Sequence, residues 1–178
     1  MKKAFYIVLA VIATMVAAFF LGPKPAAPKY STKLPKISLA LGELEDSINS
    51  FELNAGALEC AYTEILWADS VRQTEYVFLY LHGFSATKHE GDTLRYMLPK
   101  RYGMNALYNR MAGHGLDEED ALRMSGFTAE EAWNKALYDF ALAKRLGKKI
   151  IIGSCSTGSL LALRLAAKYT DDIDALIN

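Results

Sequence analysis

The segment Lys148–Leu160, with the sequence KKIIIGSCSTGSL, decides the fold. It joins an apolar run, typical of a buried strand, to a turn of small residues and then to a helical pattern. Ser156 lies at the apex of this turn. A strand that turns sharply into a helix holds its apex residue in a strained backbone conformation, and bulky residues two positions away would collide with it. Ser154 and Gly158 occupy those two positions. The segment therefore predicts a nucleophile elbow with Ser156 as the nucleophile.

Two features of the turn leave other interpretations open. The usual elbow has glycine at both crowded positions, and this sequence departs from it at Ser154, although serine is also small enough to fit. An isolated S-x-S-x-G sequence most often forms a polar turn, so the flanking strand and helix carry the prediction. Cys155 is a competing nucleophile, but it precedes the apex.

The rest of the chain after Gly56 alternates short apolar runs with helical stretches, which is typical of a parallel sheet with crossover helices. The pattern predicts strands at Ala61–Trp67, Tyr76–Leu81, Met104–Tyr108, Lys149–Gly153 and Ile173–Ile177. It predicts helices at Ser38–Leu53, Thr128–Leu146 and Leu160–Tyr169, the second of them opened by a capping box of Thr128 and Glu131. This order predicts an α/β fold with an open, doubly wound, mostly parallel sheet.

A second turn of small residues follows the strand that ends in Leu79-Tyr80-Leu81, with the sequence His82-Gly83-Phe84. Together with the turn at Ser156, it resembles the α/β-hydrolase family, and the resemblance covers Ala61–Asn178. It implies an oxyanion hole formed by the backbone amides of Phe84 and Thr157, since attack on an ester carbonyl creates a negative oxygen that needs such donors. Thr157 also begins a helix, whose dipole favours the same charge. The resemblance implies that His82 braces the turn; direct catalysis by His82 is the alternative.

A third motif, Arg110-Met-Ala-Gly-His-Gly115, resembles the R-x-x-G-H-G turn of lysophospholipase-like and monoglyceride-lipase-like members of that family. Gly113 and Gly115 permit positive φ on either side of His114, which predicts a tight loop. Direct catalysis by His114 is the alternative.

The family pattern places the catalytic acid and histidine on later strands, beyond Asn178. All three histidines of the chain, at positions 82, 89 and 114, precede Ser156. The acidic residues at 171, 172 and 174 lead into the last expected strand, at the wrong end of the sheet, and we expect a solvated turn there. We therefore expect residues 38–178 to be an incomplete α/β-hydrolase domain, cut off after the helix that follows the elbow.

The N-terminus carries an apolar segment. Lys2 and Lys3 precede an uncharged stretch, Ala4–Gly22, that as a helix covers about 28 Å, close to the thickness of a bilayer core. We expect residues 1–22 to be an uncleaved membrane anchor with the body outside the cytosol. A cleaved signal segment, giving a secreted or periplasmic protein, is the alternative. The proline- and lysine-rich residues 23–37 predict an extended, solvated linker.

Composition excludes other classes of function. Twenty basic and twenty acidic residues cancel, so the chain has no net positive charge to attract nucleic acid. Two cysteines, Cys60 and Cys155, are too few for a disulfide framework or a paired metal site, and we expect two separate buried thiols. No cofactor and no metal are expected.

These features predict a carboxylic ester hydrolase that acts on a small ester or a lipid through an acyl intermediate on Ser156. Fold alone does not define a substrate. The alternative is a membrane-anchored, non-catalytic binding or scaffold protein derived from such a hydrolase.

Overall fold

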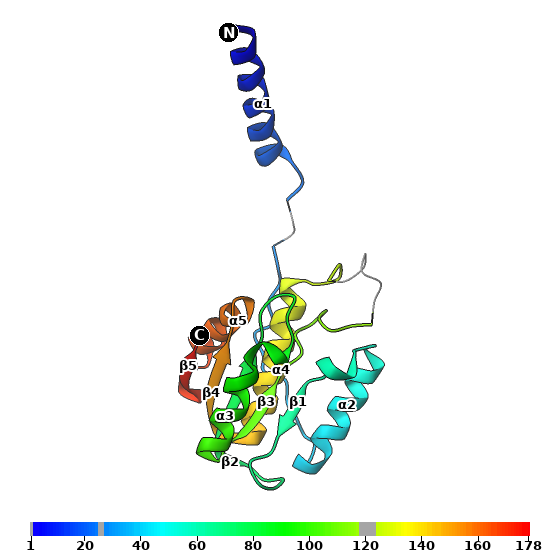
Figure 1. Cartoon of the computed structure of the whole chain (residues 1–178), viewed down its shortest axis with the longest axis vertical. Coiled ribbons are helices and arrows are strands. Elements are labelled where there is room, and N and C mark those ends of the chain that lie inside the picture. The colour runs from blue at the N-terminus through cyan, green and yellow to red at the C-terminus, as the bar shows by residue number, and fades with distance from the viewer. Residues whose placement is uncertain (1, 25–26, 118–123) are drawn as a thin grey trace.

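The computed structural model describes residues 2–24, 27–117 and 124–178, and Figure 1 shows an α/β body joined to one N-terminal helix. The α-helices are α1 (Lys2–Leu21), α2 (Leu44–Asn54), α3 (Asp92–Tyr102), α4 (Ala129–Leu146) and α5 (Thr157–Lys168). The strands are β1 (Glu64–Leu66), β2 (Thr74–Leu81), β3 (Asn105–Tyr108), β4 (Gly147–Ser154) and β5 (Ile173–Ile177). Short 3-10 turns occupy Leu41–Glu43, Glu59–Ala61, Lys88–Gly91 and Thr170–Asp172.

The strands form one mixed sheet in the order β1-β3-β2-β4-β5. Strand β1 is antiparallel to β3, and the other neighbouring pairs are parallel. Because β2, β3 and β4 run in the same direction, the loops that follow Leu81, Tyr108 and Ser154 meet at one edge of the sheet. We call this the carboxyl edge.

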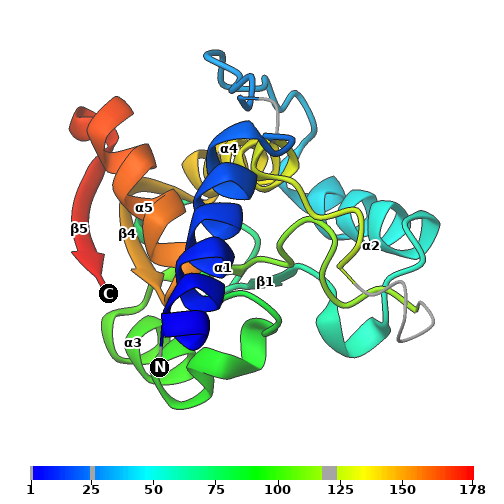
Figure 2. The same ribbon diagram turned by 90° about the horizontal axis from the view of Figure 1, so that it is seen from above.

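The sheet separates two apolar clusters, because successive side chains of a strand point to opposite faces. Leu79 and Ile152 belong to the larger cluster, which includes buried side chains of α2, α4 and α5. Phe78 and Tyr108 belong to the smaller cluster, against which Leu98 of α3 packs. Seen from above, α3 and α4 lie on opposite sides of the sheet, so the sheet has helices on both faces (Figure 2).

The predicted α/β fold is confirmed, with differences in single elements. The first strand has only three residues, Glu64–Leu66, because a 3-10 turn occupies Glu59–Ala61 where the strand was expected to begin. Helix α3 was not predicted, since it contains Pro99 and lacks an apolar stripe. Its Arg95 is only 2% exposed and lies over the ring of Tyr108, so tertiary contacts stabilise this helix.

In the second half of the predicted linker, three side chains pack on the body and the others stay exposed. Tyr30, Leu34 and Ile37 pack against the larger cluster. The indole nitrogen of Trp133 donates a hydrogen bond of 2.9 Å to the Ser31 carbonyl. We call residues 29–37 the strap, because they bind across α4 and α5. Aromatic and aliphatic residues among the lysines and prolines explain the difference, since each buries apolar surface on the body.

Helix α1 is exposed along its described length, and Lys3–Leu21 is long and apolar enough to cross a membrane. The same length and composition also fit a signal sequence near an N-terminus. The predicted membrane segment is therefore a helix.

The two cysteines are free and separate, as expected, but the prediction that both are buried is wrong. Cys60 is exposed and Cys155 is half-buried. Cys60 lies in the 3-10 turn that shortens the first strand, where its side chain points away from the core.

Candidate active site

The turn between β4 and α5 has the backbone of a nucleophile elbow. Strand β4 ends at Ser154, helix α5 begins at Thr157, and Ser156 between them has φ 48° and ψ −113°. This conformation is rare for a residue with a side chain and costs on the order of 1–3 kcal/mol, so the surrounding contacts must hold it. The side chain of Ser156 is exposed.

Helix α5 approaches β2 so closely that only glycine fits at position 158. A Cβ atom there would collide with the carbonyl oxygen of Leu81 and would lie 2.6 Å from that of His82. The Cys155 amide donates a 3.2 Å hydrogen bond to the same Leu81 carbonyl. Ser154 is buried, and its hydroxyl is hydrogen-bonded to the side chain of Asn178. The two small residues that the sequence placed around the apex thus lie in crowded positions.

The two predicted turns meet at the carboxyl edge. A Cβ atom placed on Gly83 would lie 3.4 Å from the Cβ atom of Ser156. The amides of Gly158 and Ser159 are used within the elbow, at 2.8 Å from the Cys155 carbonyl and 3.0 Å from the Ser156 carbonyl. Within the described part of the chain, neither the Phe84 amide nor the Thr157 amide donates a hydrogen bond. Both amides are therefore available to a bound oxygen.

The imidazole of His82 joins the loops after β2 and β3. Its Nε2 accepts a 3.0 Å hydrogen bond from the Met111 amide, so Nδ1 carries the proton and donates to the Gly83 carbonyl at 2.8 Å. His82 is fully buried, and this burial lowers its pKa to about 4. The ring is therefore neutral at neutral pH, and both nitrogens are occupied by main-chain groups.

His114 has a similar arrangement in the loop after β3. Its Nε2 accepts a 3.0 Å hydrogen bond from the Ser85 amide, and its Nδ1 lies 2.9 Å from the Ala112 carbonyl. Burial lowers the pKa of His114 as well. Gly113 and Gly115 have φ 70° and 60°, as the sequence predicted for a tight loop.

His89, the third histidine, lies in the 3-10 turn before α3 and is about half-exposed. Its Nδ1 lies 3.2 Å from the Asp92 carboxylate, and its Nε2 lies 3.2 Å from the Cys60 carbonyl. All three imidazoles of the chain are therefore bound to other groups, and none of their recorded hydrogen bonds is to Ser156.

Glu90 is a residue of the site that the sequence did not indicate. Its Oε2 accepts hydrogen bonds from the Gly83 amide at 2.7 Å and from the Tyr80 hydroxyl at 3.3 Å. Burial, and then the nearby carboxylate of Glu90, raise the pKa of the Cys155 thiol. One carboxylate thus binds the first turn and lies near the second. The 3-10 turn at Lys88–Gly91 brings it back to Gly83, and no periodic pattern marks such a turn in the sequence.

Arg110, the first residue of the third motif, belongs to a buried ion pair. Its Nε donates to the carboxylate of Glu52 on α2, and the two side chains are 5% and 1% exposed. Its Nη1 donates a 2.9 Å hydrogen bond to the His114 carbonyl, and its amide donates to the Thr63 hydroxyl at 3.1 Å. The arginine therefore fixes the loop after β3 to the first helix of the body.

An apolar wall and a small cavity lie beside the two turns. The rings of Phe84, His114 and Phe127 contact one another edge to face, with centroids 5.2 to 5.6 Å apart. A cavity of about 230 Å³ lies next to them, with Ser85, Thr87 and Leu116 in its lining. Ser156 is not among the lining residues.

The acidic residues around the start of β5 lie far from Ser156, and the described residues form no metal site. Asp172 and Asp174, at the opposite edge of the sheet, pair with Lys144 at 2.6 Å and Lys149 at 3.6 Å. In residues 2–24, 27–117 and 124–178, no three His, Cys, Asp or Glu side chains gather into a group that could bind a metal ion.

The depressed pKa of His82 predicts that stability falls in mild acid. The unfolded imidazole takes up a proton below pH about 6.5, whereas the folded one does so near pH 4, so the unfolded state binds more protons between these values. The contribution of neutral His82 to the free energy of unfolding is complete above pH 6.5. It falls by roughly 3 kcal/mol as the pH drops to about 4. Chemical denaturation between pH 7 and 4 measures it. His82→Gln should flatten the curve, whereas His89→Gln should not; equal slopes in all three proteins would contradict the assignment.

No family model and no curated protein matches the chain. Solved structures do match. One was reported for the metagenome-derived lipolytic enzymes LipS and LipT, with TM-score 0.57 and 17% identity over 67% of this chain and 45% of the other. Another is Est1E from Butyrivibrio proteoclasticus with bound ferulic acid, with TM-score 0.54 and 20% identity over 64% and 46%. The matched part spans less than half of the length of each of these two solved structures. At this level of identity the comparison shows the fold alone: the described body has a mixed α/β sheet with helices that matches part of these α/β-hydrolase structures.

Proposed function

We propose that the protein is a carboxylic ester hydrolase in which Ser156 forms an acyl intermediate. The observation that carries the proposal is the strained Ser156 at the turn from β4 to α5, exposed and next to Gly83. A hydroxyl presented in this way, beside unused main-chain amides, suits attack on a carbonyl carbon.

The proposed reaction begins when the Ser156 oxygen bonds to the ester carbonyl carbon and loses its proton to a base. The carbonyl electrons move to the oxygen, which accepts hydrogen bonds from the Phe84 and Thr157 amides. Collapse of this intermediate expels the alcohol, which takes the proton back from the base, and leaves acyl-Ser156. Water then hydrolyses the acyl group to the acid and restores the Ser156 hydroxyl. Since the three histidines of the chain are bound elsewhere, the proposal takes the base and its acidic partner from sequence beyond Asn178.

The substrate is proposed to be an ester of a small molecule or a lipid. LipS and LipT are described as lipolytic, and Est1E binds ferulic acid. We further propose that residues 4–22 anchor the protein in a membrane with its body outside the cytosol. Cleavage of the same segment would give a secreted or periplasmic protein. The lysophospholipase-like subfamily remains a proposal based on the R-x-x-G-H-G turn.

A second candidate function is a membrane-anchored binding or scaffold protein without catalysis. The observation that favours it is the hydrogen bonding of His82, His89 and His114, which leaves Ser156 without a neighbouring imidazole base. In that case the elbow would be retained for its packing against β2.

Reaction with a fluorophosphonate probe separates the two candidates, because the probe labels only an activated serine. The protein, with all sequence that its gene encodes after Asn178, is treated with the probe and the adduct is located by peptide mass spectrometry. The hydrolase proposal expects one adduct, on Ser156. An unlabelled folded protein would favour the scaffold, and an adduct on another serine would refute Ser156 as the nucleophile.

Glu90→Ala should lower kcat/KM for a water-soluble ester by about tenfold, with the change mainly in kcat. The reason is that Glu90 holds the Gly83 amide, which precedes the proposed donor Phe84, and a misplaced donor loses part of the ~3–4 kcal/mol that such a group supplies. Glu90→Gln retains an oxygen acceptor and should keep most of the activity.

The matched control for Glu90 is Glu75→Ala, which removes an exposed carboxylate at the start of β2 and should leave the kinetics unchanged. Steady-state kinetics with p-nitrophenyl acetate measure all three variants. Full activity of Glu90→Ala would show that the turn keeps its shape without this contact.

A further inference from the structure

The strap determines where the body is joined to helix α1. The Lys29 amide donates to the carboxylate of Glu130, in the first turn of α4. The Lys168 ammonium donates to the Thr32 carbonyl at 2.7 Å, and the guanidinium of Arg164 lies 3.7 Å from the Tyr30 ring centroid. Together with the bond from Trp133 to Ser31, these contacts fix the strap from its first residue.

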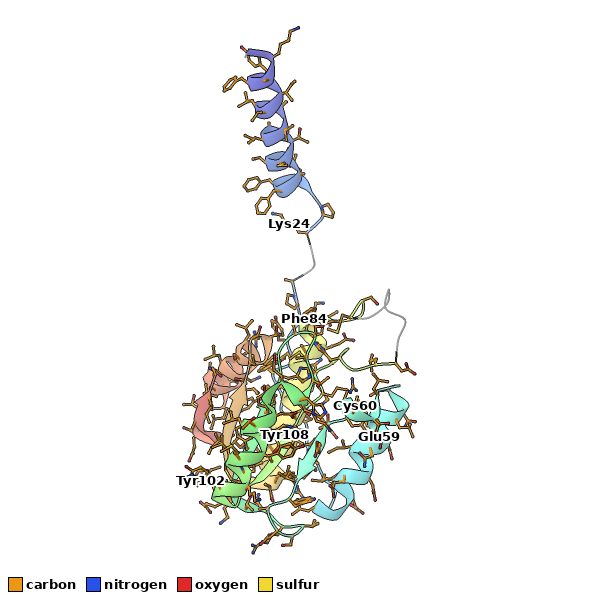
Figure 3. The ribbon with its side chains drawn as sticks, viewed as in Figure 1. Lys24, Glu59, Cys60, Phe84, Tyr102 and Tyr108 are labelled. Atoms are coloured by element: carbon orange, nitrogen blue, oxygen red, sulfur yellow. The ribbon has the colours of Figure 1, made fainter. Side chains whose placement is uncertain are left out.

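The point of attachment lies at the carboxyl edge. Phe127 precedes α4 by two residues, and its ring lies 5.4 Å from that of Phe84. Phe84 follows Gly83, which lies beside Ser156. Figure 3 agrees: Phe84 is at the end of the body from which the chain leaves toward Lys24, and Tyr102 is near the opposite end.

The segment between α1 and the strap is short. It consists of the seven residues Gly22–Pro28, which we call the tether, and whatever its conformation it spans at most about 25 Å. The eight residues of β2 cover about 26 Å between the two edges of the sheet. The tether starts at the carboxyl edge and is no longer than the distance between the two edges. It is therefore too short to let the opposite edge face the membrane surface at which α1 ends.

The carboxyl edge also presents exposed apolar side chains around Ser156. Phe84 is 52% exposed, and Leu160, in the first turn of α5, is 69% exposed. Such side chains favour the interface between lipid headgroups and acyl chains. The opposite edge begins at Thr74 and Gly147 and is preceded by Asp69–Gln73, in which Val71 is the one apolar residue.

We infer that the carboxyl edge faces the membrane that holds α1, so that the site at Ser156 takes esters of amphiphiles resident in that bilayer. This inference rests on the proposed ester hydrolysis and on membrane insertion of α1. The substrate class is an acyl ester with a polar headgroup, presented from the bilayer and not from solution.

Photocrosslinking tests the orientation without requiring activity. The protein is inserted in phosphatidylcholine vesicles that contain a phosphatidylcholine with a diazirine on its acyl chain, and the adducts are located by peptide mass spectrometry. We expect adducts in α1 and in the peptides that contain Phe84 and Leu160, and none in residues 69–73 or 100–103. Equal labelling of both edges, or labelling confined to α1, would overturn the inference.

The matched control lengthens the tether. Insertion of about twenty Gly and Ser residues after Gly22 makes it roughly fourfold longer and should reduce the local concentration of the body at the surface about eightfold. Adducts in the body should fall accordingly, while those in α1 stay the same. Unchanged labelling of the body would contradict a restraint by the tether.

Kinetics on two substrates distinguish failure of the orientation from failure of the proposed function. The longer tether should slow hydrolysis of a monoacylglycerol in vesicles about eightfold and leave p-nitrophenyl acetate unaffected. Equal rates on vesicles for both tethers would refute the orientation and leave the hydrolase intact. Lipid adducts at Phe84 and Leu160 without hydrolysis of either ester would support the orientation and refute the hydrolase.

Discussion

Ser156→Ala should lower kcat for ester hydrolysis by about 10⁴-fold or more in the full-length protein and abolish fluorophosphonate labelling. The reason is that the acyl intermediate forms on this hydroxyl, and alanine has no atom to replace it. The backbone at position 156 has φ 48°, which alanine tolerates no worse than serine, so the fold should be unchanged. Initial rates with p-nitrophenyl acetate, together with circular dichroism, measure the two effects.

The controls for Ser156 are its neighbours. Ser159→Ala removes a hydroxyl in the first turn of α5, and Cys155→Ala removes the competing nucleophile; both should keep most of the activity. Ser156→Gly should also be inactive but should raise the free energy of unfolding by about 1 kcal/mol, because glycine adopts the strained conformation freely. Comparable activity in Ser156→Ala and wild type would end the serine hydrolase proposal.

Glu52→Ala should destabilise the body by about 3–5 kcal/mol, because it leaves the charge of Arg110 buried without a partner. The two side chains are almost completely buried, so little solvent reaches the guanidinium in place of the lost carboxylate. The same change removes the acceptor of the Thr63 amide, which lies 3.2 Å from Glu52. Urea denaturation followed by tryptophan fluorescence measures the loss.

Two controls separate burial of charge from general damage to α2. Glu59→Ala removes an exposed carboxylate just after that helix and should change stability by less than about 0.5 kcal/mol. The double change Glu52→Leu with Arg110→Met removes both charges and should recover most of the stability that Glu52→Ala loses. A loss below about 1 kcal/mol in Glu52→Ala would mean that the ion pair is not maintained in solution.

The sequence was most informative where local chemistry determines the structure. The elbow at Ser156 needs small residues at fixed positions, and the chain contains Ser154 and Gly158 there. Helix α4 begins at the predicted capping box, where the Thr128 hydroxyl accepts a 3.2 Å hydrogen bond from the Glu131 amide. Strands β2 and β4 were found because strands buried on both faces are continuously apolar.

The features that the sequence did not reveal depend on contacts between distant positions. Glu52 and Arg110 are 58 residues apart, and nothing near either residue indicates the partner. Glu90 reaches Gly83 only because a 3-10 turn folds back over the end of β2. Helix α3 is held by its buried Arg95, and the strap by Trp133. In each case the stabilising contact joins separate segments of the chain, so a local sequence pattern cannot predict it.

The strap also has a consequence for the order of events during synthesis. Ser31 and Lys168 are 137 positions apart, so the two sides of this contact emerge from the ribosome at very different times. Until α5 has been made, Tyr30 has only part of its binding surface, and the nascent body is free to turn about its N-terminal segment. The chain therefore acquires a defined orientation late, when its last described helix closes over residues made near the beginning.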